Sequence, residues 1–275
     1  MMEEMFQNLC LLKKEFAQIY SGTSHIQEII PLKPSKKFPI DEKILNSLHM
    51  FAEKNPIYYN SYHDKILDVP CIVYEGDINE YWLNSIKHGS SCQPFYPTWI
   101  LSAYFLVLMA KKFGVKELID IGSGDGRIAY CGKISGLVSH GIEIDDVLAD
   151  LQKTIMTSTK IDFDPNCSDA LEFDYTSLKL ACPVFFIGGL PQMGGDMLAT
   201  GIIEKIQSIP NLKKNTCLVF AGSNSKRQLS GNQKSGGWSS LIDKYNLQEI
   251  TTISLPTVWT FDQTIDTPYI YTSFN

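Results

Sequence analysis

The sequence predicts an α/β protein whose mostly parallel sheet carries a ligand site at the carboxyl ends of its strands. Three observations support this fold class. A short apolar strand at residues 117–121 runs into glycines at positions 122, 124 and 126. A second β-prone segment, Val138–Ile144, leads directly into a helical stretch. Apolar strands at 183–187 and 217–221 then continue the alternation of strand and helix, which is typical of parallel sheets.

The glycine-rich turn is the most informative segment. A chain that turns sharply from a buried strand into a helix needs positive φ angles, and no Cβ atoms wherever a ligand approaches the backbone. Gly122, Gly124 and Gly126 meet both needs. The dinucleotide spacing G-x-G-x-x-G would place its third glycine at Arg127, which weakens a nicotinamide or flavin interpretation, and no Gly-Lys-Ser/Thr follows to make a P-loop. The remaining alternative is a glycine-rich turn without a ligand.

An acidic residue stands at the tip of the second strand. Glu143 follows the glycine loop by about 20 residues, where a carboxylate accepts hydrogen bonds from a ribose diol. The alternative is a helix-capping or solvated acid. Asp145 or Asp146 fits that role better, because carboxylates favour a helix N-terminus.

These residues together resemble a known family. The pattern Asp120-x-Gly122-x-Gly124-x-Gly126, followed by Gly141-Ile142-Glu143, is similar to the first motif and the next acid of class I, seven-strand, S-adenosylmethionine-dependent methyltransferases. The resemblance covers roughly residues 96–275. It implies a three-layer sandwich with a seven-stranded, mostly parallel sheet, a C-terminal antiparallel hairpin and S-adenosyl-L-methionine as the cofactor.

The resemblance also implies roles for individual residues. In that family the glycine loop lies under the methionine part of the cofactor, the leading acid helps to hold its amino group, and the second-strand acid binds the ribose hydroxyls. Asn166-Cys167-Ser168-Asp169-Ala170 looks like the third family position, which gives Asp169 the adenine role; the alternative is an Asx-turn after a short strand. The cofactor-binding residues implied are Asp120, Gly122, Ser123, Gly124, Gly126, Glu143, Ile144, Asp169 and Ala170.

The segment after strand 183–187 is expected to face the methyl acceptor, since ligands of open α/β sheets lie outside the carboxyl ends of the strands. This segment lacks the Asn/Asp-Pro-Pro-Tyr/Phe of enzymes that methylate nucleobase amines, and Cys182 precedes the strand where cytosine C5 enzymes need a cysteine after it. Tyr96 and Trp99 are candidates for a lid, or else core residues. The candidate substrate-facing residues are Tyr96, Trp99, Gly189, Leu190, Pro191 and Gln192, and no catalytic base is identified.

Composition limits the partners. The formal net charge of −6 and the pI near 5.4 give no field that attracts phosphate, and only Arg127 and Arg227 are available for bidentate phosphate contacts. Nucleic acid is therefore disfavoured, and a protein or small-molecule acceptor is expected. The Tyr-Pro-Thr segment at 96–98 and the helix after it also resemble the region before the glycine loop in some archaeal and mitochondrial seven-strand protein lysine methyltransferases. That likeness is short, and the chain departs from the pattern further on.

Cysteine usage and hydropathy suggest a location. Seven cysteines without a C-x-x-C pair favour reduced thiols in the cytoplasm over disulfides or a zinc site, and the five histidines show no metal-ligand spacing, so no metal is predicted. The N-terminal Met-Met-Glu-Glu does not resemble a signal peptide. The longest apolar run, Ile100–Ala110, has eleven residues, against about 20 for a membrane span. We expect a soluble, cytoplasmic protein with no membrane contact.

Residues 1–95 are predicted to form a mainly helical extension or cap on a methyltransferase domain at 96–275. Apolar residues at four-three spacing make an amphipathic helix whose narrow seam packs within the chain or forms a dimer contact. A second helix begins after Asp41 and ends at Asn55-Pro56, and the structure of Ile57–Trp82 is left open. The seam residues are Met5, Leu9, Leu12, Phe16 and Ile19.

The C-terminal part completes the expected sheet. A helix is predicted around Met197–Ile206, a short helix at Trp238–Tyr245, and two strands at Leu247–Leu255 and Pro268–Phe274. The polar segment Ser223–Gly237 is too long for an ordinary connection, so it is either an active-site flap or a plain loop.

The function expected is transfer of a methyl group to a protein side chain, lysine included, or to a small molecule. The alternative is a noncatalytic partner subunit with a methyltransferase fold, because Gly188-Gly-Leu-Pro-Gln192 carries little chemistry. An aminopropyltransferase is less favoured, since those enzymes resemble a Gly-Gly-Gly-Asp-Gly loop where this chain has Ile-Gly-Ser-Gly-Asp-Gly.

Overall fold

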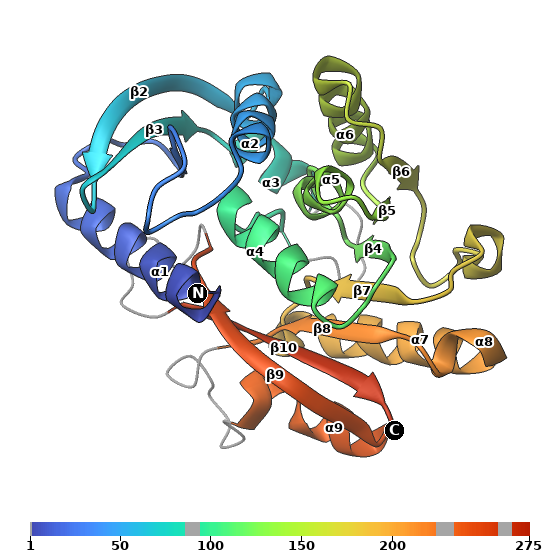
Figure 1. Ribbon diagram of the computed structural model, residues 1–275. Helices are drawn as coiled ribbons and strands as arrows, with labels where there is room; N and C mark the ends of the chain where they lie inside the picture. Colours follow the sequence, from blue (N-terminus) through green and yellow to red (C-terminus); the bar gives the residue numbers. More distant parts are fainter. Residues whose placement is uncertain (1, 86–93, 224–233, 258–265) are drawn as a thin grey trace.

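The computed structural model describes residues 2–85, 94–223, 234–257 and 266–275 (Figure 1). A seven-stranded sheet with the order β6-β5-β4-β7-β8-β10-β9 forms its centre. The first five strands in that order are parallel, and β10 is antiparallel to both β8 and β9. The strands are β4 (Glu117–Ile121), β5 (Val138–Glu143), β6 (Asp164–Cys167), β7 (Pro183–Ile187), β8 (Cys217–Ala221), β9 (Leu247–Leu255) and β10 (Thr267–Phe274).

Helices cover both faces of this sheet. Alternate residues of the central strands point to opposite sides, so Leu118 packs with one core cluster and Ile119 with the other. Both faces are buried, which explains the continuous apolar runs of β7 and β8. One face holds α4 (Ile100–Lys111), α5 (Arg127–Ile134) and α6 (Asp146–Thr159); the other holds α7 (Gly195–Ser208), α8 (Pro210–Lys213) and α9 (Ser239–Lys244). Short 3₁₀ turns lie at η2 (Tyr175–Leu178), η3 (Pro191–Met193) and η5 (Lys234–Gly237).

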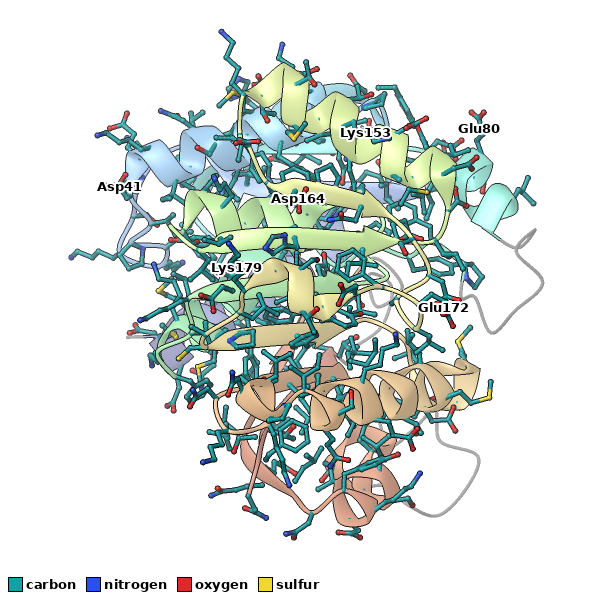
Figure 2. The ribbon with its side chains drawn as sticks, turned by 90° about the vertical axis from the view of Figure 1, so that its right-hand side faces the viewer. Asp41, Glu80, Lys153, Asp164, Glu172 and Lys179 are labelled. Atoms are coloured by element: carbon teal, nitrogen blue, oxygen red, sulfur yellow. The ribbon has the colours of Figure 1, made fainter. Side chains whose placement is uncertain are left out.

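The expected three-layer α/β fold and its closing hairpin are therefore confirmed. Charged side chains such as Lys153, Asp164 and Lys179 lie on the outside of the layers (Figure 2). Most of the predicted loop at 223–237 falls on residues 224–233, which lie outside the described residues, so its role stays a prediction.

The N-terminal segment contains the two expected helices, α1 (Met2–Ile19) and α2 (Glu42–Lys54), and a third that we did not predict, α3 (Asn79–Ser85). Asp41 caps α2 by accepting a hydrogen bond from the backbone N–H of Lys43 at 2.8 Å. The segment also contains a three-stranded antiparallel sheet that we did not predict, with the order β1-β3-β2. Its strands are β1 (Ile26–Pro31), β2 (Tyr58–Ile66) and β3 (Val69–Gly76).

The seam of α1 packs within the chain. Met5, Leu9, Leu12 and Phe16 are at most 7% exposed and belong to the same core cluster as α4. Only Ile19 of the predicted seam is exposed, at 52%. The dimer contact proposed through this seam is therefore not supported, because its apolar residues are already buried.

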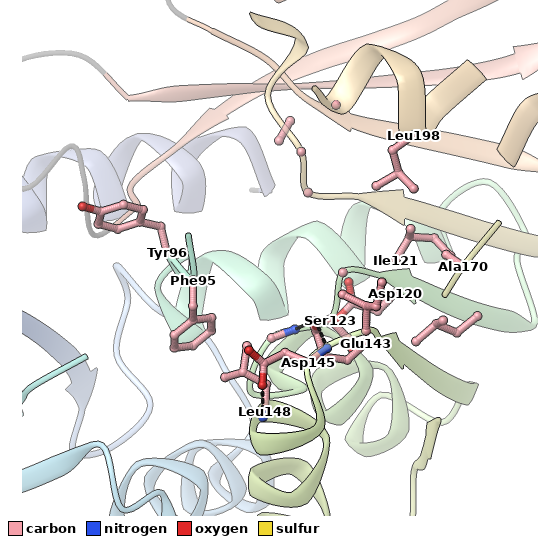
Figure 3. Close-up of a pocket in the computed structure, with 18 of the residues that line it drawn as sticks. Phe95, Tyr96, Asp120, Ile121, Ser123, Glu143, Asp145, Leu148, Ala170 and Leu198 are labelled. Carbon is pink, nitrogen blue, oxygen red and sulfur yellow. Dashed lines mark hydrogen bonds between the residues drawn. The ribbon is translucent and has the colours of Figure 1, made fainter. Parts of the chain in front are cut away.

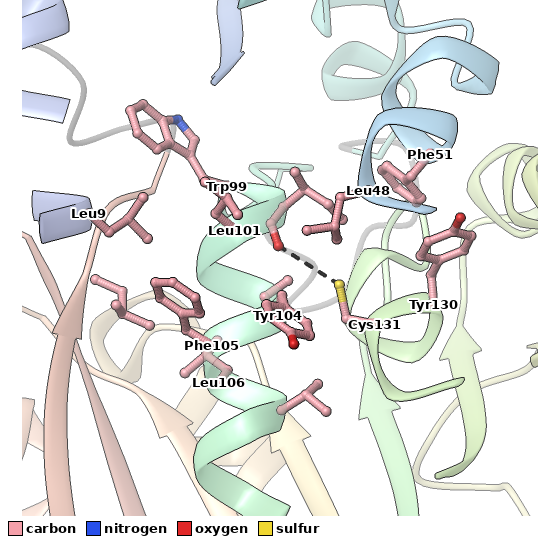
Figure 4. Packing of buried hydrophobic residues seen from close by; sticks show 14 of the residues in the cluster. Leu9, Leu48, Phe51, Trp99, Leu101, Tyr104, Phe105, Leu106, Tyr130 and Cys131 are labelled. Carbon is pink, nitrogen blue, oxygen red and sulfur yellow. Dashed lines mark hydrogen bonds between the residues drawn. The ribbon is translucent and has the colours of Figure 1, made fainter. Parts of the chain in front are cut away.

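The eleven-residue apolar run forms α4, which lies buried between α1, α5 and the sheet (Figure 4). The thiol of Cys131 in α5 donates to the backbone carbonyl of Ile100 at 3.8 Å, joining the two helices. Among the described residues, no helix has both the length and the apolar character that crossing a bilayer requires.

Candidate active site

The glycine-rich turn joins β4 to α5 in the predicted conformation. Gly122, Gly124 and Gly126 all have positive φ, at 67°, 57° and 78°. The backbone N–H groups of Gly122 and Ser123 donate to the carbonyl of Ile142 in β5 at 2.9 and 3.1 Å. The turn is thereby tied to the neighbouring strand.

The three glycines serve different purposes. A Cβ at position 122 would meet no protein atom within 4 Å, so this glycine faces open space. A Cβ at position 124 would lie 2.5 Å from the Phe95 ring, and one at 126 would lie 2.9 Å from Gln152 and 3.0 Å from Phe163. Gly126 therefore permits close packing of α5 against α6 and does not line the cavity described next, so the cofactor contact expected of it stays a prediction.

A cavity of about 600 Å³ opens at the carboxyl ends of β4, β5, β6 and β7 (Figure 3). This size lies within the range of small-molecule sites. The cavity brings together most of the residues expected to bind a cofactor, namely Asp120, Gly122, Ser123, Gly124, Glu143, Ile144, Asp169 and Ala170.

Glu143 ends β5 and is 7% exposed. Its Oε2 accepts from the N–H of Gly124 at 2.7 Å, and its Oε1 accepts from the N–H of Asp145 at 3.1 Å. Burial raises the pKa of Glu143, while these N–H donors oppose the rise. Each oxygen retains acceptor capacity toward the cavity. Asp145 instead caps α6 by accepting from the N–H groups of Val147 and Leu148, the role that we expected for it.

Asp120 lies in β4, two residues before Gly122, and is 3% exposed. Its Oδ2 has no hydrogen-bond partner among the described residues. Burial, followed by the charges of Glu143 and Asp125, raises the pKa of Asp120 well above its ordinary value. A buried carboxylate oxygen without a partner is costly, so a cationic donor in the cavity would relieve it.

Asp169 follows β6 and lines the cavity from an exposed position. Its Oδ1 accepts from the N–H of Leu171 at 2.8 Å, which is the Asx-turn considered as the alternative. Asp169 thus both forms the Asx-turn and lines the cavity. The adjacent Ala170 is buried, at 8% exposure.

The charges that line the cavity are strongly unbalanced. Five carboxylates face one guanidinium, that of Arg127, which is itself paired with Asp125 through Nη2 and Oδ2 at 2.6 Å. The cavity therefore favours a ligand that carries positive charge. The carboxylates are those of Asp120, Asp125, Glu143, Asp145 and Asp169.

Three expected substrate-facing residues line the other end of the cavity, and three do not. Tyr96, Gly189 and Leu190 line it. Trp99 does not, because it lies in the core beside α1 at 1% exposure (Figure 4). Pro191 and Gln192 also lie outside the lining, since the chain turns away there into η3, and Gln192 Oε1 accepts from the hydroxyl of Ser223 at 2.5 Å.

Sequence reasoning missed other lining residues at this end. Phe95 packs against Gly124, and the hydroxyl of Tyr269 in β10 donates to Thr98 Oγ1 at 3.1 Å. The Pro-Phe-Tyr-Pro run could have pointed to Phe95, whereas no local signal marks Tyr269. The described lining residues 94–98, 188–195 and 269 carry no carboxylate, imidazole, amine or thiol. Nor do the described side chains include any group of three metal-ligating residues.

Comparison with known proteins gave matches only among solved structures. No protein-family model and no curated protein matches the sequence. The structure is similar to a ribosomal protein L11 methylase from Lactobacillus delbrueckii subsp. bulgaricus, with 13% identity, a TM-score of 0.44, and coverage of 63% of this chain and 79% of that one.

Two further similar structures have other substrates in their names. A Pyrococcus abyssi tRNA (uracil-54, C5)-methyltransferase has 13% identity, a TM-score of 0.45 and coverage of 66% of this chain and 40% of that one. A mitomycin 7-O-methyltransferase has 14% identity, a TM-score of 0.47 and coverage of 64% and 54%. The match thus spans less than two thirds of these two proteins. The strand order and the antiparallel β9–β10 pair, rather than these scores, identify the architecture: a seven-stranded, mostly parallel sheet that closes with an antiparallel hairpin.

Proposed function

We propose that this protein is an S-adenosyl-L-methionine-dependent methyltransferase that transfers a methyl group to a protein side chain, lysine included, or to a small molecule. The observation that carries the proposal is the excess of carboxylates around the glycine turn, with an unpartnered buried oxygen on Asp120. S-adenosylmethionine carries an ammonium, a sulfonium and one carboxylate. Its net positive charge therefore complements the acidic lining of the cavity.

The residues take separate parts in binding. Asp120 would accept from the ammonium, Glu143 from the ribose hydroxyls and Asp169 from the adenine amino group. Gly122, which faces open space, lets the methionine part approach the backbone. Ser123, Gly124, Ile144 and Ala170 complete the wall around these groups.

The bound cofactor supplies an electrophilic methyl group, so the protein has to orient the acceptor and exclude water. Tyr96, Gly189 and Leu190 lie where the acceptor would enter. Because no described side chain there acts as a strong base, an amine acceptor would have to lose its proton to water before transfer. The apolar surroundings favour this loss, since desolvation lowers the pKa of an amine.

The acidic lining also supports a protein or small-molecule acceptor over nucleic acid. Its single guanidinium, on Arg127, is buried and paired, which leaves it no role in binding phosphate. A cytoplasmic location and the division into segments 1–95 and 96–275 stay predictions. The alternative function, a noncatalytic cofactor-binding subunit, is favoured by the absence of a base among the described residues at the acceptor end.

Incubation with methyl-labelled cofactor and cell extract tests the proposal. We expect label in the protein or the small-molecule fraction, and a lysine analysis of labelled protein identifies the acceptor atom. Label in none of the fractions, despite cofactor binding, would favour the noncatalytic subunit. Failure to bind the cofactor at all would overturn the proposal.

A further inference from the structure

A fully hydrogen-bonded buried cluster lies directly behind the glycine turn. Arg127, the first residue of α5, is 2% exposed. Its Nε and Nη2 donate to the two oxygens of Asp125 at 2.9 and 2.6 Å. Its Nη1 donates to Glu28 Oε1 and to the carbonyl of Thr98, and Nη2 also donates to the hydroxyl of Tyr58 at 3.2 Å. All five guanidinium N–H groups therefore have acceptors, which a lysine could not reproduce.

The partners on the far side come from the N-terminal segment. Glu28 lies in β1 at 0% exposure, and its second oxygen accepts from the N–H of Ile100 at 2.9 Å. Tyr58 in β2 donates to Glu28 Oε1 at 2.9 Å. Asn55, the C-cap residue that follows α2, donates to Asp125 Oδ2 at 2.9 Å. Three elements of the first 60 residues thus converge on two residues of the turn.

The cluster holds Asp125 and Arg127, the part of the segment that follows Gly124. Asp125 stands between Gly124 and Gly126, which both have positive φ and, without a Cβ, leave the backbone unusual freedom. Asp125 and Arg127 are both buried, so removing any of these partners leaves one of their hydrogen-bonding groups unsatisfied, which is unfavourable. The turn is therefore held in its cofactor-ready shape from behind.

We propose that Glu28, Asn55 and Tyr58 are positioning residues of the cofactor site, acting through the Asp125–Arg127 pair. They do not line the cavity themselves. In this proposal the N-terminal segment supports the cofactor site from behind the glycine turn and does not cover it. The identity of the ligand rests on the proposed function, but the effect of these three residues on the shape of the turn does not.

A matched pair of variants tests the link. Tyr58→Phe removes a hydroxyl that contacts the cluster. Tyr74→Phe, at a residue of β3 in the same small sheet, removes a hydroxyl that contacts His49 of α2 at 2.9 Å. The two rings are 6.3 Å apart and both residues are held in the N-terminal segment, so their general effects on folding should be similar. Only Tyr58→Phe alters a contact to Arg127.

We expect Tyr58→Phe to weaken S-adenosylmethionine binding about three- to tenfold by calorimetry, and Tyr74→Phe to change it less than about twofold. In the ligand-free protein, amide hydrogen exchange at residues 122–127 should be about fivefold faster in Tyr58→Phe only. Glu28→Gln, which leaves a neutral group beside Arg127, should exceed Tyr58→Phe in both measurements.

Equal changes in both tyrosine variants would show a general folding role and overturn the proposal. Unchanged exchange at 122–127 in both Tyr58→Phe and Glu28→Gln would overturn it as well. If the wild-type protein binds no S-adenosylmethionine, the proposed function fails, while the exchange comparison on the ligand-free protein still decides whether the cluster positions the turn.

Discussion

Asp120 is the residue whose charge has the clearest consequence. Its raised pKa means that the folded ligand-free protein binds its proton more tightly than the unfolded chain does. The free energy of unfolding therefore falls as pH rises from the ordinary carboxyl pKa through the raised value. A cofactor ammonium would reverse this cost.

Asp120→Asn should separate stability from binding. We expect the ligand-free variant to be more stable than wild type by about 1–3 kcal/mol at pH 8, with a smaller gain at pH 5, because the variant has no charge to bury. Its affinity for S-adenosylmethionine should fall about 10- to 100-fold, since a hydrogen bond to a charged group is lost. Urea unfolding at both pH values and calorimetry measure the two effects. The exposed Asp162→Asn serves as the control, and loss of stability in Asp120→Asn with unchanged affinity would contradict this role.

Gly122 offers a second test at this scale. Gly122→Ala and Gly114→Ala both place a Cβ on a residue with positive φ, at 67° and 76°, and neither Cβ would touch the protein. Both should lose about 1–2 kcal/mol of stability through backbone strain. Only Gly122→Ala should also weaken cofactor binding, because its Cβ enters the cavity. Equal affinities in the two variants would mean that no ligand approaches Gly122.

At the scale of elements, α1 is bound to the rest of the molecule by one face. Leu9 is fully buried in the core that α1 shares with α4, whereas Leu11 on the same helix is 49% exposed. The apolar seam is thus part of the fold of the single chain.

Truncation of these two leucines should have different effects. Leu9→Ala should lower the free energy of unfolding by about 2–5 kcal/mol, as large-to-small core changes do, and Leu11→Ala by less than about 0.5 kcal/mol. Denaturant unfolding measures both. Similar losses in the two variants, or a change of oligomeric state on Leu9→Ala, would show that α1 packs against a second copy instead.

Across the whole molecule, the features set by neighbouring residues could be predicted from the sequence, whereas the contacts between distant residues could not. The glycine turn and Glu143 were predictable because positive φ and a strand tip are local properties. The hydrogen bond from Arg127 to Glu28 joins residues 99 positions apart, and no local sequence pattern predicts it. The β2–β3 hairpin was missed for a local reason: its turn residues Leu67 and Asp68 adopt φ of 53° and 60°, where Asn-Gly is the usual signal.

Trp99 shows the same limit at the acceptor end. The nearby Tyr96 lines the cavity, but Trp99 precedes α4 as its N-cap residue and lies in the core, a position fixed by helix packing and not by sequence position. Aromatic residues near a ligand site are therefore ambiguous until the helices around them are placed. The N-terminal segment shows the opposite case, in which residues that were not predicted to belong to the site support it. This segment, predicted as a cap, supplies Glu28, Asn55 and Tyr58 to the cluster behind the turn.

A crystal structure with bound S-adenosylhomocysteine tests the central claim most directly, because it shows which side chains meet the ligand. The ligand is expected in the cavity beside Gly122, with its amino group within hydrogen-bond distance of Asp120 Oδ2 and its ribose hydroxyls on Glu143. A ligand bound elsewhere, or an Asp120 that stays without a partner while the cavity is filled, would contradict it.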